Sequence, residues 1–391
     1  MVEEAENMSE RITNKELTMI KLQLLANGIS FDSNFLKNYN NSVYIEKRWA
    51  YGNGDEEVFA CKIPQEIKLK DIVVAVHYRK DSKWVLTSSG DKYSLNYNDS
   101  FIIDVTFPLR PKFYDEKLKN GTYCRSVGTL YGGGALGIFS PGSCYNFKQG
   151  LPCKFCSLEP TRNKLGDHVK DITPELAAEL VEVALTKDSN LIGQIMLNGG
   201  NYPSNDYGFL KQVNTVKLIR EKMSGLELKD NIEIHLIGMP PDDLSLLDEL
   251  SDLDVQVSMN IEVYSPEIFE DIAPGKHKFY GRNKIIKGLE KAVDILGKGN
   301  VYTVFLGGLE PMQSLENGLY FMAQKGINPV INVFHPDPKS GLGNYPRVSV
   351  ESMEKMGEIL QEVYTKFNFR SLFQGFGRNS LDNEAYLGYF G

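Results

Sequence analysis

Cysteine is scarce in this chain of 391 residues, which contains only five, and no secretory signal or membrane-length apolar stretch is evident. An odd cysteine count without a signal disfavours a disulfide framework and indicates a reducing, cytoplasmic setting. No glycine-rich loop has the dinucleotide-binding or P-loop arrangement, so the run 132–134 is better interpreted as a hinge. These absences exclude a disulfide-stapled secreted domain and leave no standard nucleotide-phosphate motif.

Excess positive charge is also missing, because 43 basic residues face 51 acidic ones and the net charge is −8. This balance argues against a general binder of nucleic-acid phosphates. We therefore expect no nucleic-acid partner and no membrane association. The length and the 42% hydrophobic content predict a globular protein of two or three domains.

The pattern of apolar residues changes near the glycine run. Residues 43–106 contain short β-rich runs separated by polar turns, whereas strands and amphipathic helices alternate after residue 134. Alternation of this kind is typical of a parallel βα sheet or barrel. The sequence predicts an α/β fold: an N-terminal β-rich accessory or cap domain over 1–130, and a partial (β/α)6 TIM-like barrel with a C-terminal extension over 131–391.

Six strands are expected in the second region. Thr173 with Pro174 predicts the start of one crossover helix, Asn283 the start of another, and residues 349–364 form a last amphipathic helix. A Phe-rich tail then packs back onto the core. The expected strands span 135–140, 192–197, 232–237, 255–261, 301–306 and 330–334.

Three of the five cysteines, Cys144, Cys153 and Cys156, lie within thirteen residues of one another. Thiolates grouped on one loop suit an iron–sulfur cluster, and a cubane held by three cysteines leaves one iron open. A zinc site is the alternative, and it needs a fourth ligand, for which His168 is the nearest histidine. The remaining Cys61 and Cys124 are either buried structural thiols or hydrogen-atom donors.

Functional residues of a parallel barrel gather where its strands end. Here the cysteine loop follows the first expected strand, and polar or glycine-rich segments follow the second, fourth, fifth and sixth, at 198–201, 260–262, 307–310 and 335–336. This ordered set resembles the radical S-adenosylmethionine (SAM) superfamily over residues 135–345. The ending Cys153-Lys154-Phe155-Cys156 is its strongest mark, whereas eight residues between Cys144 and Cys153 replace the three that are usual in the family.

The resemblance implies a [4Fe–4S] cluster on the three cysteines and SAM bound to its open iron. Asn201 stands where the family has a glutamate for the SAM ammonium, so an amide oxygen replaces a charged acceptor. The implied SAM contacts are Phe155 and Leu309 at the adenine, with backbone groups near Gly307; Asn198, Gly199, Gly200 and Asn201 at the ammonium; Asn260 and Glu262 at the ribose; and Arg282 at the carboxylate.

The resemblance further implies that SAM is cleaved reductively to a 5′-deoxyadenosyl radical, which abstracts hydrogen from a substrate. Our specific expectation is a lyase or mutase acting on a small heterocyclic or nucleoside-like metabolite, such as a modified purine-like base, with flavodoxin or ferredoxin as electron donor. The two alternatives are a peptide- or protein-modifying enzyme and a zinc-stabilised binding module without enzymatic activity. Candidate substrate contacts are Tyr202, His277, Tyr280 and His335.

Overall fold

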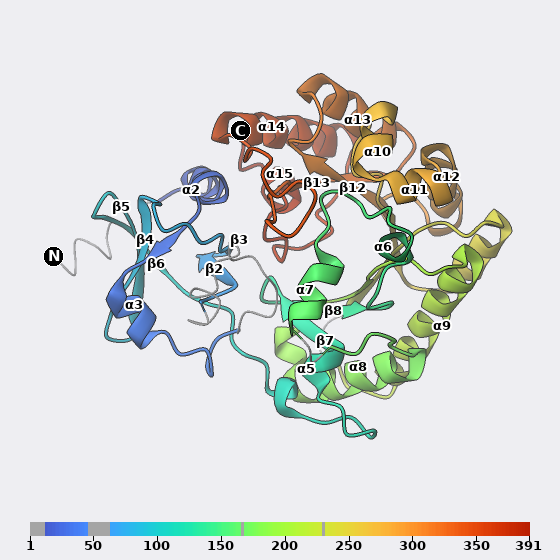
Figure 1. The fold of residues 1–391 in the computed structure, drawn as a ribbon, viewed down its shortest axis with the longest axis horizontal. Helices are drawn as coiled ribbons and strands as arrows, with labels where there is room; N and C mark the ends of the chain where they lie inside the picture. The colour runs from blue at the N-terminus through green and yellow to red at the C-terminus, as the bar shows by residue number, and fades with distance from the viewer. Residues whose placement is uncertain (1–11, 46–62, 166–167, 229–230) are drawn as a thin grey trace.

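A curled sheet of seven strands forms the centre of the computed structural model, which describes residues 12–45, 63–165, 168–228 and 231–391 (Figure 1). Its order is β13-β12-β11-β10-β9-β8-β7. The strands β8 to β13 are parallel, and β7 pairs antiparallel with β8 at one edge. The bounds are β7 (Gly128–Tyr131), β8 (Ala135–Phe139), β9 (Gln194–Asn198), β10 (Glu233–Gly238), β11 (Gln256–Met259), β12 (Val301–Gly307) and β13 (Asn328–Val333).

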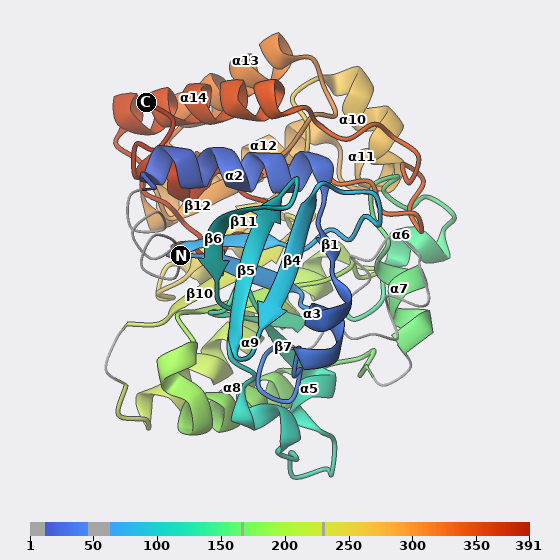
Figure 2. The same ribbon diagram turned by 90° about the vertical axis from the view of Figure 1, so that its left-hand side faces the viewer.

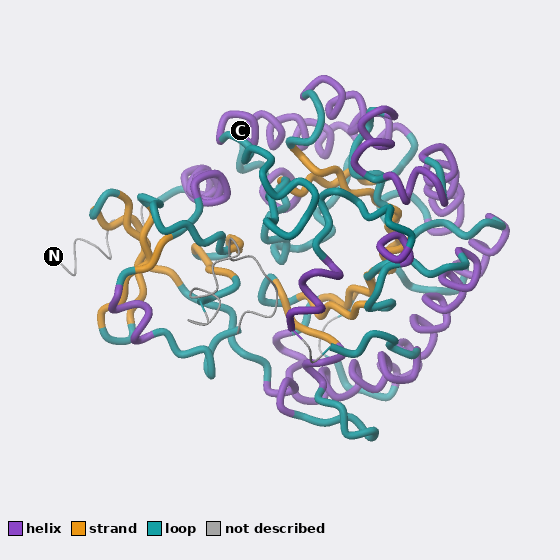
Figure 3. The backbone as a smooth tube through the Cα atoms, in the orientation of Figure 1, coloured by secondary structure: helices purple, strands orange, loops and turns teal. Residues whose placement is uncertain are grey.

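The predicted α/β partial barrel is confirmed, and each of the six expected strands is present within a few residues of its expected bounds. Because neighbouring strands follow one another in sequence, the connections return outside the sheet, where helices enclose it (Figure 3). The outer helices are α8 (Pro174–Asp188), α9 (Asn205–Ser224), α10 (Pro266–Ile272), α11 (Pro274–Phe279), α12 (Arg282–Leu296), α13 (Met312–Gln324) and α14 (Val350–Phe367), with 3-10 turns at Ser189–Leu191 and Leu244–Leu250.

Local signals set the starts of these helices. The Thr173 hydroxyl accepts a hydrogen bond from the Leu176 amide, and Pro174 occupies the first turn of α8. Ser349 caps α14 in the same way. The helix expected to open at Asn283 begins one residue earlier, at Arg282, after Gly281 in a left-handed conformation with φ of 76°.

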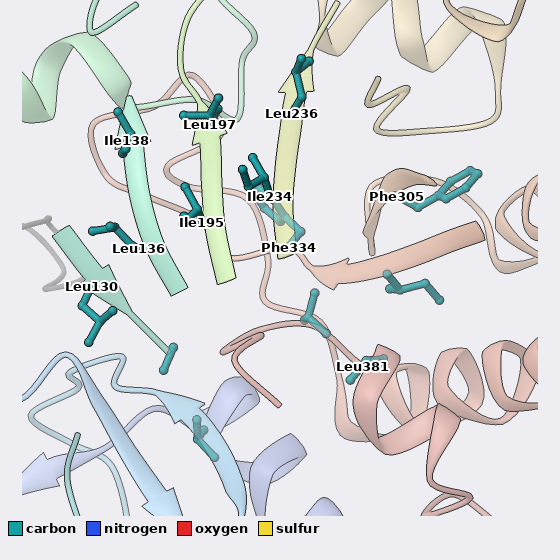
Figure 4. Packing of buried hydrophobic residues seen from close by; sticks show 14 of the residues in the cluster. Leu130, Leu136, Ile138, Ile195, Leu197, Ile234, Leu236, Phe305, Phe334 and Leu381 are labelled. Atoms are coloured by element: carbon teal, nitrogen blue, oxygen red, sulfur yellow. The ribbon is translucent and has the colours of Figure 1, made fainter. Parts of the chain in front are cut away.

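Alternation along the strands separates two apolar clusters. Leu136 and Ile138 of β8 and Leu197 of β9 belong to the main core, together with apolar residues of the helices (Figure 4). The side chains that alternate with these along the strands point to the inside of the barrel. There, Ala135 of β8 and Met196 of β9 join a second, smaller cluster. This period of two is what a strand with different surroundings on its two faces requires.

The N-terminal region contains a four-stranded sheet of order β1-β4-β5-β6, the hairpin β2–β3 and the helix α2, which lies beside α14 (Figure 2). Residues 46–62, within the region 43–106 expected to be β-rich, fall outside the described residues. The bounds here are α2 (Asn14–Asn27), β1 (Ser30–Phe31), α3 (Ser33–Asn38), β2 (Glu66–Leu69), β3 (Ile72–Ala75), β4 (Trp84–Ser89), β5 (Lys92–Tyr97), β6 (Ser100–Val105), a 3-10 turn at Lys112–Asp115 and α5 (Cys124–Val127).

The segment 371–381 returns from α14 into the barrel. It runs antiparallel to β13, since the Val333 amide donates to the Asn379 carbonyl at 2.9 Å and the Leu381 amide to the Ile331 carbonyl at 3.0 Å. Leu372 and Phe373 pack in the inner apolar cluster. The short helix α15 (Asp382–Tyr386) follows. None of the described helices is both long and apolar enough to span a membrane.

Candidate active site

The inside of the barrel contains a cavity of about 470 Å³. Its wall combines residues of the strands, the cysteine loop and the C-terminal segment 373–379. Five residues predicted from the sequence meet there: Phe155, Cys156, Asn198, Asn260 and His335. The ends of the first, second, fourth and sixth parallel strands therefore open onto one shared cavity, as expected for a barrel site.

Hydrogen bonds to the backbone of all three cysteines, and to the sulfur of Cys144, fix the cysteine loop. The Cys144 amide donates to the Glu159 carboxylate at 2.9 Å, and the Asn201 amide donates to the Cys144 sulfur at 3.4 Å. The Cys156 amide donates to the Cys153 carbonyl at 3.0 Å, which closes a tight turn between these two cysteines. Short helices flank the cysteines at α6 (Tyr145–Lys148) and α7 (Leu158–Leu165).

Gly199 and Gly200 allow the end of β9 to touch this loop. A Cβ atom on Gly199 would lie 2.4 Å from the Pro141 carbonyl oxygen, and one on Gly200 would lie 2.2 Å from the Ser143 oxygen and 2.5 Å from the Cys144 Cβ. No side chain fits at such distances, so glycine is needed at both positions. The predicted glycine pair thus lies directly against the first cysteine.

The three thiols influence one another electrostatically. Burial is the main cause that raises the pKa of Cys153 and brings that of Cys156 to about 11, and the charges of the neighbouring cysteines act in the same direction. Soft sulfur donors coupled in this way fit an iron–sulfur cluster, whose iron would compensate the thiolate charges. No three His, Cys, Asp or Glu side chains in the described ranges surround a single ion position. In a cubane, by contrast, each cysteine binds a different iron.

Asn260 and Glu262 do not share a strand face, contrary to the expectation from their spacing. β11 ends at Met259, and Glu262 has a φ of 65°, which turns its side chain away from the regular alternation. The Asn260 amide oxygen accepts from the Ser258 hydroxyl at 2.6 Å, and Asn260 lines the cavity. The Glu262 carboxylate instead pairs with Lys276, whose side chain is largely buried.

Other predicted residues lie apart from the cavity. The Arg282 guanidinium lies over the Tyr264 ring, 4.8 Å from its centroid. His277 is half exposed beside Glu270 on the outer surface. Gly307 packs against the Met356 sulfur.

Tyr202 hydrogen-bonds to the Ser140 hydroxyl and lines a second, outer groove together with Asn201. Tyr280 is buried, which raises its pKa, and the charge of Cys144 adds to the rise, so its phenol lies near the cysteine loop. Leu309 is buried in the main core. Cys124 is also buried, which raises its pKa to about 11, and Cys61 falls outside the described residues.

The cavity wall also holds polar residues that sequence reasoning missed. The Thr161 hydroxyl and the amide oxygens of Gln194, Asn198 and Asn379 are buried without a hydrogen-bond partner among the described residues. Leaving one such atom unpaired costs about 1–3 kcal/mol, which favours a polar occupant. The sequence could have indicated Gln194, because a polar residue at the start of a buried parallel strand requires a partner. No sequence pattern pointed to Asn379.

Two contacts join the cavity wall to the N-terminal region. The Arg378 guanidinium lines the cavity and pairs with the buried Glu66 at 3.0 Å. The His335 ring stacks on the His77 ring with centroids 3.6 Å apart. Glu66 of the hairpin β2–β3 and His77, just after the hairpin, therefore support Arg378 and His335, which line the cavity.

Comparison with known proteins gives a partial match. The chain is 27% identical over 238 residues to a bacteriochlorophyllide c C-7(1)-hydroxylase of Chlorobaculum limnaeum, covering 58% of this chain and 59% of the relative. The chain thus spans about three fifths of the length of that curated relative. No family model matches.

Two solved structures resemble the chain only distantly. The FeFe-hydrogenase maturase HydG from Carboxydothermus hydrogenoformans gives a TM-score of 0.45 at 17% identity, over 61% of this chain and 53% of that one. A radical SAM methyltransferase from Sphaerobacter thermophilus gives 0.43 at 15%, over 63% and 69%.

The site geometry has the arrangement that the sequence resemblance implies. Three coupled cysteines follow the first of six consecutive parallel strands, a glycine pair at the end of the second strand packs against them, and a cavity opens beside them. This arrangement is the one implied by the resemblance of the sequence to the radical SAM superfamily, whose members use a [4Fe–4S] cluster and SAM.

Proposed function

We propose that Cys144, Cys153 and Cys156 hold the [4Fe–4S] cluster and that the protein acts on a small molecule in the barrel cavity. The observation that supports this most is the position of Cys156, which lies both on the cysteine loop and in the cavity wall. When bound, the reduced cluster and SAM supply a 5′-deoxyadenosyl radical that removes a hydrogen atom from the substrate. The protein residues position the substrate and exclude water.

The residues in the cavity wall are the proposed SAM contacts: Phe155, Asn198 and Asn260. Asn201 brings no charge for the SAM ammonium, and Glu159 is the nearest carboxylate along the loop, bonded to the Cys144 amide. Glu262 and Arg282 have protein partners, Lys276 and Tyr264. We therefore propose that Glu262 and Arg282 support the structure around the SAM site. Gly199 and Gly200 act through their close approach to the loop.

We propose a planar heterocyclic substrate and a lyase or rearrangement reaction. The cavity wall is rich in aromatic rings, including Phe139, Phe373 and Phe376, which suit a flat molecule. The unpaired amide oxygens favour a ligand with N–H or O–H donors. Among the four predicted substrate residues, His335 is the one we place in contact with the substrate. Residues 1–130 form the proposed cap, and flavodoxin or ferredoxin the proposed donor.

A second candidate reaction is hydroxylation at a C–H bond. It is favoured by the curated relative, whose name describes hydroxylation of bacteriochlorophyllide c. Hydroxylation and rearrangement share the hydrogen-abstraction step and differ in whether an oxygen atom enters the product. Product mass after incubation in isotopically labelled water separates the two, since only hydroxylation with water as the oxygen source incorporates the label.

The test is purification without oxygen, measurement of iron, sulfide and zinc, and reduction in the presence of SAM with detection of 5′-deoxyadenosine. We expect a cluster and SAM cleavage in the wild-type protein and in Cys124→Ala, the matched control for a buried cysteine away from the loop. Cys156→Ala should lose both. Retained cleavage in Cys156→Ala, or stoichiometric zinc without cleavage in the wild type, would overturn the proposal.

A further inference from the structure

Gln194 places a fully buried carboxamide at the start of β9, in the wall of the barrel cavity. The protein uses the amino end of this amide twice: Nε2 donates to the Leu372 carbonyl oxygen and lies 3.2 Å from the His235 Nε2 atom. The oxygen at the other end, Oε1, is buried without a hydrogen-bond partner among the described residues. One end of the amide is therefore satisfied, and the other is left for an occupant of the cavity.

The neighbours of Gln194 fix which end of the amide remains open. A carbonyl oxygen can only accept, so Leu372 requires the amino end on its side, and a flipped amide would set two oxygens against each other. Leu372 is itself held, because its amide donates to the buried Asp382 carboxylate at 3.1 Å. The His235 ring is held on its other side, where Nδ1 lies 3.1 Å from the Tyr302 hydroxyl. Gln194 thus presents an acceptor and no donor.

The wall around Gln194 is otherwise apolar. Met196, the next residue of β9 on the same face, belongs to the inner apolar cluster, and the rings of Tyr131 and Phe376 pack against this cluster. A Cβ atom on Gly193 would lie 2.7 Å from ring carbons of Phe376, so that ring lies against the backbone next to Gln194. An unpaired acceptor in such surroundings costs about 1–3 kcal/mol, and a ligand that pairs with it recovers this cost.

Gln194 lies at the end of β9 that is remote from the cysteine loop. Four residues separate it from Asn198, which corresponds to about 13 Å along a strand. The far end of β9 continues into Gly199 and Gly200, which touch the loop. An occupant that reaches Gln194 therefore does so with the edge that points away from the cysteines.

We propose that Gln194 is a specificity-determining residue whose amide oxygen accepts a hydrogen bond from an N–H group of the substrate. This inference rests on the proposed function and narrows the planar heterocycle to one with an N–H on its edge remote from the cysteine loop. An analogue without that N–H leaves the oxygen unpaired. Sites built around a hydrogen bond reject such analogues far more strongly than apolar sites distinguish small changes of shape.

The test compares two probes of nearly equal shape, indole and benzofuran, by equilibrium dialysis against the purified holoprotein. Benzofuran has an oxygen atom where indole has its N–H and is the less polar of the two, so a purely apolar cavity prefers benzofuran. We expect the wild type to bind indole about tenfold more tightly, because indole alone supplies a donor to the buried oxygen. Gln194→Met, which keeps the length of the side chain, should reduce this preference to within about twofold.

Gln256→Met is the matched control. Gln256 opens β11 as Gln194 opens β9, and its amide oxygen is also buried without a partner among the described residues. It does not belong to the cavity wall, so its replacement should keep the preference for indole. If Gln194→Met fails to fold, Gln194→Asn keeps an amide but withdraws it by one methylene group, and this variant should lose the preference as well.

Three results would overturn the inference: benzofuran binding as tightly as indole to the wild type, a preference for indole that survives in Gln194→Met, or binding of neither probe. The dialysis does not depend on SAM cleavage. A protein that prefers indole but cleaves no SAM therefore contradicts the proposed function and leaves the acceptor role of Gln194 standing.

Discussion

Glu66 and Arg378 form a buried ion pair of 3.0 Å between segments 312 residues apart in the sequence. The same Glu66 oxygen also accepts from the Gly132 amide at 3.1 Å, at the entrance to the seven-stranded sheet. One carboxylate thus joins the N-terminal hairpin, the first barrel turn and the C-terminal segment. The position of a cavity-lining arginine therefore depends on residues from both ends of the described chain.

Glu66→Gln is expected to destabilise the protein and displace Arg378. The glutamate side chain is fully buried, and removing one partner of a buried pair costs about 3 kcal/mol. Urea unfolding followed by circular dichroism measures the loss. Asp81→Asn is the control, because Asp81 is highly exposed in its pair with Arg79 and its removal should leave the unfolding midpoint unchanged. Equal effects of the two substitutions would contradict the prediction.

Gly200→Ala is expected to disrupt the cysteine loop without unfolding the barrel. The added methyl group would overlap the Ser143 oxygen and Cys144, and overpacking of this kind costs about 1–3 kcal/mol. Bound iron should fall by at least about half while the far-ultraviolet circular dichroism stays the same. Gly225→Ala, whose nearest neighbour would lie at 3.7 Å, should keep its iron. Full iron content in Gly200→Ala would show that the loop can move aside.

Glu233 predicts a dependence of stability on acid pH. Burial alone would raise its pKa, but hydrogen bonds and charges from His235 and Arg370 outweigh burial and lower it from 4.5 to about 2. Below 4.5 the unfolded chain binds this proton more readily than the folded one, so stability is lost as the pH falls from 4.5 towards 2. Glu233 should account for about 2 kcal/mol of that loss.

The measurement is urea unfolding at about pH 5 and about pH 3 for the wild type and Glu233→Gln. The loss between the two conditions should be smaller in the variant by about 2 kcal/mol, because glutamine does not titrate. Glu270→Gln, which changes an exposed carboxylate of α10, serves as the control and should keep the wild-type loss. An identical loss in Glu233→Gln and the wild type would rule out Glu233 as the source.

Asp382→Ala is expected to release the segment that closes the cavity. The buried carboxylate accepts from the Ser371 hydroxyl at 2.8 Å and from the Leu372 and Phe373 amides at 3.1 Å each. Removing it leaves several buried donors unpaired, at about 3–5 kcal/mol. Hydrogen exchange of residues 371–381 should accelerate, and Asp382→Asn, which keeps one acceptor, should show a smaller effect. Unchanged exchange in the alanine variant would contradict this.

The sequence predicts the barrel well because its signals are local. Apolar strands, capped helices such as the one after Thr173, and polar strand ends depend on neighbouring residues. The glycine pair after β9 was found for the same reason. Even the return of the Phe-rich tail was expected, although its entry into the barrel was not.

The rest depends on contacts between distant segments. The alternation at Asn260 and Glu262 predicts a shared face, but bonds to β12 and to Lys276 stop the strand and reverse the second side chain. Lys276 itself follows Glu262 by fourteen residues and lies on the helix α11, and no pattern links the two. Asn379 reaches the cavity only because its segment pairs with β13.

The tail segment 373–379 forms part of the cavity wall, yet it follows all six parallel strands in the sequence. During synthesis the strands and the cysteine loop emerge from the ribosome before this wall exists. Until the tail arrives, the cavity beside the cysteine loop lacks this part of its wall. The order of translation therefore leaves completion of the cavity to one of the last segments made.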